Sequence, residues 1–321
     1  MPLVSVIIPT YGHAALILRT LDSVFAQTFQ DYEVIVINDG SPDNTAQVLA
    51  PLISAGRIQY FEQSNQGVAA ARNFGIANSK GKYIALFDDD DLWPPDKLEW
   101  QVAEIESCQA VLIGGTAGAI GADGSLTAPI ECQGESRVYD FEDLLDGSPF
   151  LSPGQTLIDR HALDLAGRLD SKIWGADDFD LWLGLSKQGK VIRRNRVSLY
   201  YRNHEGNASR DLVRMIRNIK KVIVKRLHGI RGQHGAECRS RAYQWVFKYL
   251  GEPMIVEMKN HLLCRPPRLR SSFVNFAVVL EIFGFQMLAD SVLRQKITCF
   301  LFSRFSNLLT LTRKPRSGAS L

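Results

Sequence analysis

The sequence has few cysteines for its length, and none of them form a C-x-x-C pair. Its five cysteines, an odd number, are widely spaced along 321 residues. This pattern argues against a disulfide scaffold and against a structural zinc site. The start of the chain also lacks the basic residues, apolar run and cleavage site of a secretory signal. We therefore expect a cytoplasmic active site.

Two common phosphate-binding motifs are missing as well. Neither G-x-x-x-x-G-K-[ST] nor G-x-G-x-x-G occurs in the chain. P-loop hydrolysis and a Rossmann dinucleotide site are therefore not supported. Any phosphate must be bound in another way, and a metal ion held by carboxylates is the obvious alternative.

The net charge is small, but its distribution along the chain is uneven. The formal net charge is +3, yet residues 209–321 carry 21 Lys and Arg against 6 Asp and Glu, whereas residues 1–208 carry 16 against 28. An acidic region can hold a cation, and a basic region can meet a polyanion or an anionic membrane. We therefore place a domain boundary near residue 209, between a domain at 1–209 and a basic helical region at 210–321.

The first region alternates short β-branched runs with helical patterns, which is typical of a parallel α/β sheet. Residues 114–148 are rich in glycine, and we expect them to form a variable excursion outside the core. A second ordered stretch runs over 150–201. The expected strands are 3–9, 33–38, 58–61 and 83–87, and the expected helices are 13–27, 44–53 and 67–78.

Polar residues follow three of these strands. They are Thr10 and Tyr11, the run from Asn38 to Ser41, and the four aspartates 88–91. In open α/β sheets, ligands bind beyond the carboxyl ends of the strands. The sequence therefore predicts that the three clusters converge on one edge of the sheet.

The four consecutive aspartates have two interpretations. So many like charges repel unless a cation or solvent relieves them, and Mg²⁺ or Mn²⁺ prefers carboxylate oxygens, so a metal and diphosphate site is one interpretation. The other is an acidic turn that caps the helix starting near Pro94, with Asp91 as the capping residue.

Six segments carry a family resemblance that covers residues 3–209. They resemble inverting family 2 glycosyltransferases, which have the GT-A fold, a Rossmann-like and mostly parallel sheet flanked by helices. The segments are VSVIIPTYGHAALILRTLDSVFAQT, YEVIVINDGSPDNT, NQGVAAARNFGIANSKGKYIALFDDDDLW, GQTLIDRHALDLAGRLD, WGADDFDLWLGL and YYRNHEGNAS.

The resemblance implies a nucleotide-sugar pocket. It implies that Pro9, Thr10 and Tyr11 line the pocket and that Asp39 meets the base. A carboxylate can accept the imide N–H of uracil, which favours UDP, although thymine shares this group and dTDP stays open. Arg72 is similar to a family residue near the nucleotide or its diphosphate, and a guanidinium suits phosphate oxygens.

Further positions follow from the same motifs. Asn73 is implied beside Arg72, and Asp89 is expected to contact the donor sugar nucleotide. Asp88 and Asp90 form the family's D-x-D, with Asp90 the stronger candidate for a direct ligand of Mn²⁺ or Mg²⁺. His204 matches a family histidine near the metal or diphosphate, and neutral imidazole is a competent ligand for Mn²⁺.

Inverting transfer also needs a base that deprotonates the acceptor hydroxyl. The segment GADDFDLWLGL resembles the family's Glu-Asp motif, which places the base at Asp178 with Asp177 where Glu is common. The alternative is that both carboxylates only cap the amphipathic helix that follows them.

Trp174 could stack on an acceptor sugar or belong to the core. The Q-x-x-R-W signature of processive synthases is absent, so we expect one sugar per encounter.

The basic region at 210–321 has helix-like, amphipathic segments. Docking on anionic lipid, acceptor docking, dimerisation and a plain solvated face are all open interpretations. The most apolar segment, 273–289, contains Glu281, and we leave open a core or dimer helix, an interfacial helix and a membrane span. The charge would suit nucleic acid, but no motif for it is present.

We therefore expect a metal-dependent glycosyltransferase that uses a nucleotide sugar in the synthesis of polysaccharide, lipopolysaccharide or another glycan. Its acceptor would be a glycan, a lipid-linked saccharide or a protein, and it could associate peripherally with the membrane. The alternatives are a sugar-1-phosphate nucleotidyltransferase and a catalytically silent glycan-binding or membrane adaptor. The donor sugar, linkage and oligomeric state are not readable from the sequence.

Overall fold

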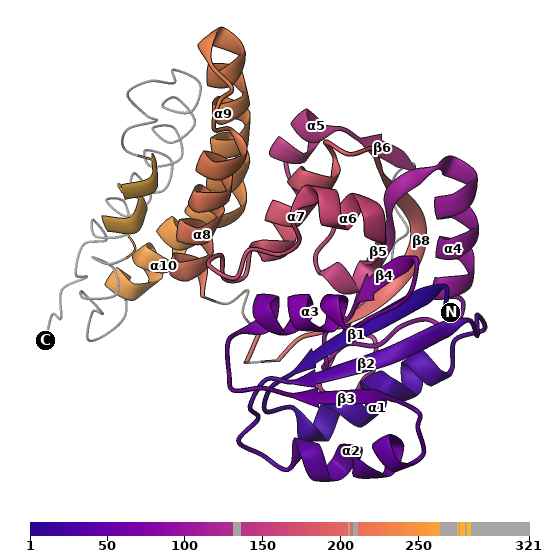
Figure 1. Ribbon diagram of the computed structural model, residues 1–321. Helices are drawn as coiled ribbons and strands as arrows, with labels where there is room; N and C mark the ends of the chain where they lie inside the picture. Colours follow the sequence, from indigo (N-terminus) through magenta and orange to yellow (C-terminus); the bar gives the residue numbers. More distant parts are fainter. Residues whose placement is uncertain are drawn as a thin grey trace, which may run out of the picture. The chain divides into compact units, whose positions relative to one another are not determined.

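The computed structural model describes residues 1–130, 136–204, 206–207, 211–263, 275, 277–279 and 281–283. The chain divides into two compact units (Figure 1). The first contains residues 1–211 together with 224–226, and the second contains residues 212–223 and the described residues from 227 onward. The functional division expected near residue 209 stays a prediction.

The first unit is built on an eight-stranded sheet with the order β3-β2-β1-β4-β7-β5-β8-β6. Strands β1 to β4 pair in parallel with one another, as do β5 and β8, whereas β7 is antiparallel to both β4 and β5, and β6 to β8. The predicted mostly parallel sheet is confirmed. The strands are β1 (Val4–Thr10), β2 (Tyr32–Asn38), β3 (Gln59–Glu62), β4 (Tyr83–Leu86), β5 (Ala110–Ile120), β6 (Arg137–Tyr139), β7 (Thr156–Asp159) and β8 (Lys190–Arg202).

Helices cover both faces of the sheet (Figure 1), which explains why its central strands are continuously apolar. Val6 and Ile8 of β1 share a buried cluster with Leu21 of α1. On the opposite face, Gly75 of α3 lies so close to Ile7 that an added Cβ would be 2.5 Å from its side chain. The helices of this unit are α1 (Ala14–Phe25), α2 (Thr45–Ser54), α3 (Val68–Ala77), α4 (Lys97–Cys108), α5 (Phe141–Leu145), α6 (Arg160–Ala166) and α7 (Asp177–Leu185), with a 3₁₀ turn η1 (Pro153–Gln155).

The expectation that residues 114–148 form an excursion outside the core is wrong for their first part. Residues 110–120 form the long strand β5, which lies between β7 and β8. Its glycines allow close packing: a Cβ at Gly114 would lie 2.4 Å from the Phe150 ring, and one at Gly115 would lie 2.1 Å from the backbone oxygen of Arg196. These glycines therefore allow an aromatic ring and a neighbouring backbone to pack closely against the strand, and they do not indicate a loop.

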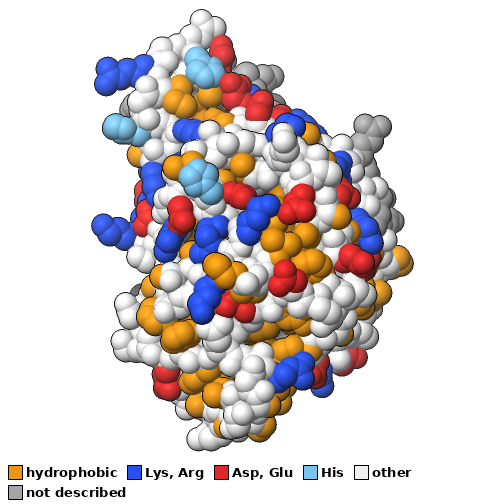
Figure 2. Space-filling model, turned by 45° about the vertical axis from the view of Figure 1, so that its right-hand side comes forward, with side chains coloured by type: hydrophobic (Ala, Val, Ile, Leu, Met, Phe, Trp, Pro, Cys, Tyr) orange, Lys and Arg blue, Asp and Glu red, His pale blue; other side chains and the backbone are white. Residues whose placement is uncertain are grey.

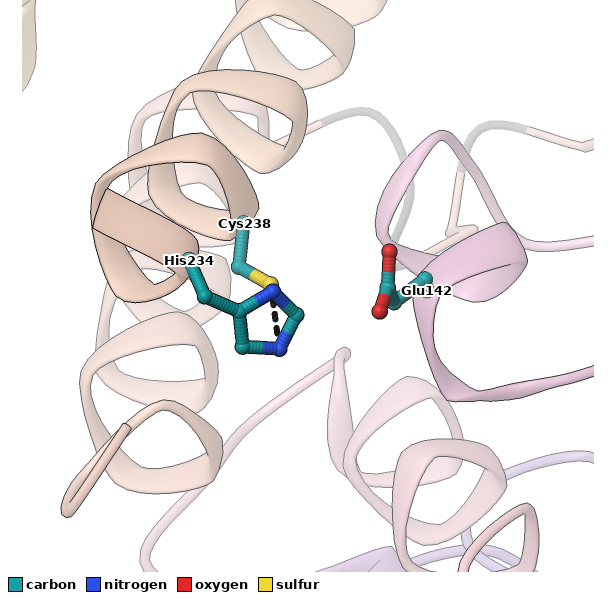
Figure 3. A group of neighbouring side chains, drawn as sticks. All are labelled: Glu142, His234 and Cys238. Carbon is teal, nitrogen blue, oxygen red and sulfur yellow. Dashed lines mark hydrogen bonds between the residues drawn. The ribbon is translucent and has the colours of Figure 1, made fainter. Parts of the chain in front are cut away.

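The second unit is helical in its described part. The buried side chains of α8 include Ile216, Ile219 and Val222, which confirms the predicted amphipathic helix. On α9, the Cys238 sulfur lies 3.9 Å from Nε2 of His234, one turn earlier (Figure 3). Glu142, also drawn there, belongs to α5 of the first unit. The elements are α8 (Leu212–Arg226), α9 (Gly232–Val246), a π-helical turn η3 (Phe247–Gly251) and α10 (Glu252–Leu263).

The apolar segment 273–289 lies mostly outside the described residues. In its described part Ile282 and Phe283 are buried, and Phe283 contacts Phe247 with ring centroids 5.3 Å apart. Glu281 is half exposed and pairs with Arg217 at 2.8 Å. None of the helices in the described ranges has both the length and the apolar character that crossing a bilayer requires.

Figure 2 shows one face of the molecule, on which acidic and basic side chains are interspersed with hydrophobic ones. The uneven distribution of charge along the sequence therefore does not give this face a single sign. Any docking surface must be sought in particular residues rather than in the overall balance of charge.

Candidate active site

The loops that follow β1, β2 and β4 meet at one edge of the sheet. The backbone N–H of Asp39 donates to the carbonyl of Thr10 at 2.9 Å. Those of Gly12 and Tyr11 donate to Ser41 Oγ and to Asp89 Oδ2, at 3.1 and 3.3 Å. The predicted convergence of the three polar clusters is confirmed.

The protein residues expected to line the nucleotide pocket at this edge differ in exposure. Tyr11 is 49% exposed, whereas Pro9 is buried within β1. Thr10 is also buried, and its hydroxyl has no hydrogen-bond partner within the described residues. Among Pro9, Thr10 and Tyr11, the exposed Tyr11 side chain and the Thr10 hydroxyl can therefore still contact a ligand.

Asp39 is buried and organises the loop that leads into α3. Its Oδ1 accepts hydrogen bonds from Gln63 Nε2 at 2.8 Å and from the Gln66 N–H at 2.9 Å, and its Oδ2 accepts one from the Gly67 N–H at 2.8 Å. Gly67 has a φ of +89°, which glycine tolerates best. The carboxylate therefore shapes this loop, and a nucleobase would have to share it with these donors.

Arg72 of α3 is buried and joins two carboxylates. Its Nη2 donates to Asp88 Oδ1 at 2.5 Å and its Nη1 to Asp177 Oδ2 at 3.0 Å. Burial alone would lower the pKa of Arg72, but the charges of Asp88 and Asp177 outweigh it and raise the pKa above its ordinary value. The guanidinium that the sequence predicted beside phosphate therefore holds two carboxylates in this structure.

Asn73, the neighbour of Arg72, is turned to the backbone. Its Nδ2 donates to the Leu169 carbonyl at 2.7 Å, and its Oδ1 accepts from the Leu169 N–H at 3.2 Å. Both ends of the amide are thus used in fixing α3 to the segment after α6. Its expected place beside the nucleotide stays a prediction.

The side chains of the four aspartates contact different partners. Asp88 accepts from Arg72 and from Ser152 Oγ, the latter at 3.1 Å. Asp91 is fully buried and accepts the backbone N–H of Arg202 at 2.8 Å. The suggestion that Asp91 caps the next helix is wrong, because α4 begins at Lys97 and its N-cap position is Asp96.

Asp89 and Asp90 each face a histidine. His13 Nδ1 lies 2.8 Å from Asp89 Oδ1, and His204 Nε2 lies 2.7 Å from Asp90 Oδ2. The two imidazole rings meet edge to face, with centroids 5.6 Å apart. His13, Asp89 and Asp90 each offer a ligand atom, and these atoms lie within 4.8 Å of one another.

The electrostatics of this cluster suit a cation. The hydrogen bond to Asp89 is the largest of the effects that raise the pKa of His13 to about 9. Burial, and then the charges of Asp88 and Asp89, raise the pKa of Asp90. Crowded carboxylates with imidazole nitrogens are donors that Mn²⁺ accepts, and a divalent cation would relieve their repulsion. The residues present therefore fit the metal that the sequence predicted.

His13 and Ser152 were not predicted from the sequence. His13 stands just before α1 in Tyr-Gly-His, where a polar residue after a strand could have been noticed. Ser152 opens the turn η1 in Ser-Pro-Gly-Gln, whose proline at the first helical position signals such a turn. Both residues contact aspartates that are distant in the sequence, so their role in the site becomes visible only in the structure.

The second carboxylate pair opens α7. Asp177 is held by Arg72, whereas Asp178 is half-buried and accepts the N–H of Phe179 at 2.7 Å. Burial first, and then the neighbouring charge of Asp177, raise the pKa of Asp178 to about 7, although Arg72 opposes this effect. A carboxyl group that titrates near neutrality can act as a general base.

The helix α7 departs from the amphipathic expectation. Its side chains from Phe179 to Leu185 are all buried, including Trp182, which packs against Phe150 with ring centroids 5.8 Å apart. Trp174, expected on the acceptor side, is half-buried four positions before Asp178. The carboxylates thus stand on a helix embedded in the domain rather than on a surface helix.

Comparison with known proteins identifies the family. The profile of "Glycosyl transferase family 2" matches residues 5–165. The chain belongs to this family. An uncharacterized glycosyltransferase of Rickettsia bellii is 34% identical over 185 residues, which make up 58% of the chain and 26% of that relative. The chain spans less than a third of the length of each of the first curated relatives it matches.

Two further comparisons cover a larger share of the chain than the family profile does. The UDP-Glc:alpha-D-GlcNAc-diphosphoundecaprenol beta-1,3-glucosyltransferase WfaP of Escherichia coli is 27% identical over 237 residues, covering 72% of this chain and 90% of WfaP. The crystal structure of S. aureus TarS in complex with UDP-GlcNAc superimposes with a TM-score of 0.64 at 17% identity, over 78% of this chain and 73% of that one. The latter likeness supports the fold.

Proposed function

We propose that this family 2 protein is a metal-dependent, inverting glycosyltransferase that moves one sugar from a nucleoside diphosphate sugar to an acceptor hydroxyl. The observation that carries the proposal is the Arg72 bridge between Asp88 and Asp177. Inverting transfer needs a charged site for the leaving diphosphate and a base for the acceptor. Two carboxylate groups at one sheet edge, linked by one guanidinium, suit these two tasks.

On the donor side, Asp88, Asp90 and His204 would hold Mn²⁺ or Mg²⁺. His13 and Asp89, which contact each other beside Asp90, are further candidates for metal ligands. A bound divalent cation would stabilise the negative charge of the departing diphosphate. The nucleoside would lie against Tyr11 and Asp39. UDP is the favoured nucleotide because a carboxylate can accept the uracil imide N–H, and the names of WfaP and TarS in its UDP-GlcNAc complex include UDP.

On the acceptor side, Asp178 would take the proton of the hydroxyl whose oxygen attacks the anomeric carbon. The attack comes from the face opposite the diphosphate, so the new bond forms as the bond to the phosphate oxygen breaks, and the configuration inverts. Asp177, held by Arg72, would position the helix start, and Trp174 would contact the acceptor sugar. A pKa of about 7 for Asp178 supports its role as the base.

We further propose a lipid-linked saccharide as the acceptor, reached by peripheral association with an anionic membrane. The basic residues of 210–321 support membrane association. The name of WfaP, a relative matched over 72% of this chain, includes a diphosphoundecaprenol acceptor.

The proposal is tested by a thermal-shift screen of nucleotide sugars with and without Mn²⁺, followed by transfer assays with the stabilising donor. A donor at 100 times its Kd should raise the stability by about 2.7 kcal/mol. Asp178→Asn should abolish transfer while donor binding survives, and Asp164→Asn, at an exposed ion pair, is the matched control. Near-normal turnover of Asp178→Asn would refute the assignment of the base.

A further inference from the structure

The last residues of α8 belong with the first unit. Residues 224–226 group with the sheet domain, although the preceding part of the helix groups with the second unit. Arg226 Nε donates to Asp180 Oδ1 at 2.6 Å, and Lys225 Nζ donates to Asp180 Oδ2 at 2.8 Å. Two cations from the basic region are therefore bound to the helix that carries the proposed base.

Asp180 needs these cations, because its side chain is 0% exposed. A buried carboxylate without a partner would be strongly unfavourable, whereas one with two charge-assisted hydrogen bonds is compensated. The two cations use different oxygens of the carboxylate. The pair therefore fixes the orientation of this side chain as well as its charge.

The surface of α7 is shaped for Arg226. Gly184 lies one turn after Asp180, on the same face of the helix. A Cβ added at Gly184 would lie 3.0 Å from Nη1 and Nη2 of Arg226. The guanidinium therefore packs directly on the helix, with its Nε on Asp180 and its plane over the glycine.

Lys225 makes a second contact that extends the clamp. Its Nζ donates to Asp170 Oδ2 at 2.7 Å. Asp170 stands before α7, in the segment that contains Trp174. The ammonium thus ties the segment leading into α7 to the helix itself.

We propose that Lys225 and Arg226 are positioning residues for the proposed base, Asp178. The base lies two residues before Asp180, on the same first turns of α7. Arg72 holds the start of the helix through Asp177, and Arg226 and Lys225 hold it one turn later through Asp180. This inference rests on the proposed function and assigns the end of α8 to the catalytic unit rather than to a membrane surface.

The test compares Arg226→Met and Lys225→Met with Arg217→Met, a control on α8 whose partner Glu281 is half exposed. For Arg226→Met we expect kcat to fall by about tenfold to hundredfold, with KM for the donor changed little, because a small misplacement of a reacting group is costly. The smaller change, Lys225→Met, should lower kcat less. Amide hydrogen exchange of residues 177–185 should be faster in both variants and unchanged in the control.

Lys225→Met and one further variant, Arg226→Lys, separate an effect on positioning from an effect on folding. Lys225 is 42% exposed, so Lys225→Met should fold even where Arg226→Met does not. Arg226→Lys keeps the charge and should recover part of kcat. If folded Lys225→Met and Arg226→Lys both kept native kcat and native exchange in α7, the inference would be wrong. Failure of the native protein to transfer sugar would refute the proposed function instead, since exchange in α7 does not depend on activity.

Discussion

Arg72 carries much of the electrostatics of the site, because it is buried and bonded to carboxylates from two distant parts of the chain. Its side chain is 5% exposed, and its partners Asp88 and Asp177 follow β4 and open α7. Removing a partner from a buried ion pair is far more costly than removing one from a surface pair.

We predict that Arg72→Met lowers the free energy of unfolding by about 3–5 kcal/mol, because the buried Asp177 and the partly buried Asp88 lose their shared cation. Lys82→Met is the control: its pair with Glu106 is half exposed, and its loss should cost about 1 kcal/mol or less. Urea denaturation measures both values. Equal stabilities of the two variants would contradict the buried bridge.

The raised pKa of Asp178 predicts opposite effects of pH on activity and on stability. Burial first, and then the charge of Asp177, raise the pKa of this carboxyl group from an ordinary 3.8 to about 7, against the opposing charge of Arg72. As the proposed base it must be ionised, so kcat should rise with pH through about 7. The unfolded chain loses this proton near pH 4 whereas the folded chain keeps it, so stability should fall as pH rises between these values.

The measurement is a pair of unfolding experiments at about pH 5 and pH 8, for the native protein and for Asp178→Asn. The native protein should lose more stability than the variant over this interval, since the variant lacks the titrating group. The same pH dependence in both proteins would show that another carboxyl group accounts for the effect.

At the scale of elements, β5 depends on glycine for its place between β7 and β8. The Cβ that Gly115→Ala would add lies 2.1 Å from the backbone oxygen of Arg196, which cannot move away as a flexible side chain could. We predict that Gly115→Ala lowers the free energy of unfolding by about 1–3 kcal/mol, as overpacking does. Chemical denaturation measures this, and unchanged stability would contradict the packing of β5 against β8.

The elements of the first half could be predicted because their apolar runs and helical periods agree with the fold that they form. The strand β5 could not, since its glycines read locally as a loop and only the contacts with Phe150 and β8 explain them. In the site, the convergence at strand ends followed from the sheet alone. The partners of Asp39, Arg72 and Asn73 did not, because each partner is at least 16 positions away in the sequence.

At the scale of the whole molecule, the basic side chains of the C-terminal region differ in their surroundings: some pair with carboxylates, and others are exposed. Lys225 and Arg226 are bound to Asp180, and Arg217 pairs with Glu281. Lys221 is exposed on α8. A count of charges therefore overstates the number of cations left for an anionic surface.

We predict that the full chain sediments with vesicles that contain anionic lipid and not with neutral vesicles, because each basic side chain near the surface contributes about 1 kcal/mol. Raising the salt from about 0.1 M to about 1 M shortens the screening length from about 10 Å to about 3 Å and should release the protein. The change Lys221→Gln should weaken binding. A protein that stays in solution with anionic vesicles at low salt would refute membrane association.

The single guanidinium shared by Asp88 and Asp177 also has a thermodynamic consequence. A ligand that changes the field at Asp88 acts through Arg72 on the carboxylates of α7, and so on the proton affinity of Asp178. Linkage is reciprocal: if donor binding changes that proton affinity by some factor, protonation changes donor affinity by the same factor. Donor affinity and the protonation of Asp178 would then be coupled through one side chain, without any movement of the backbone.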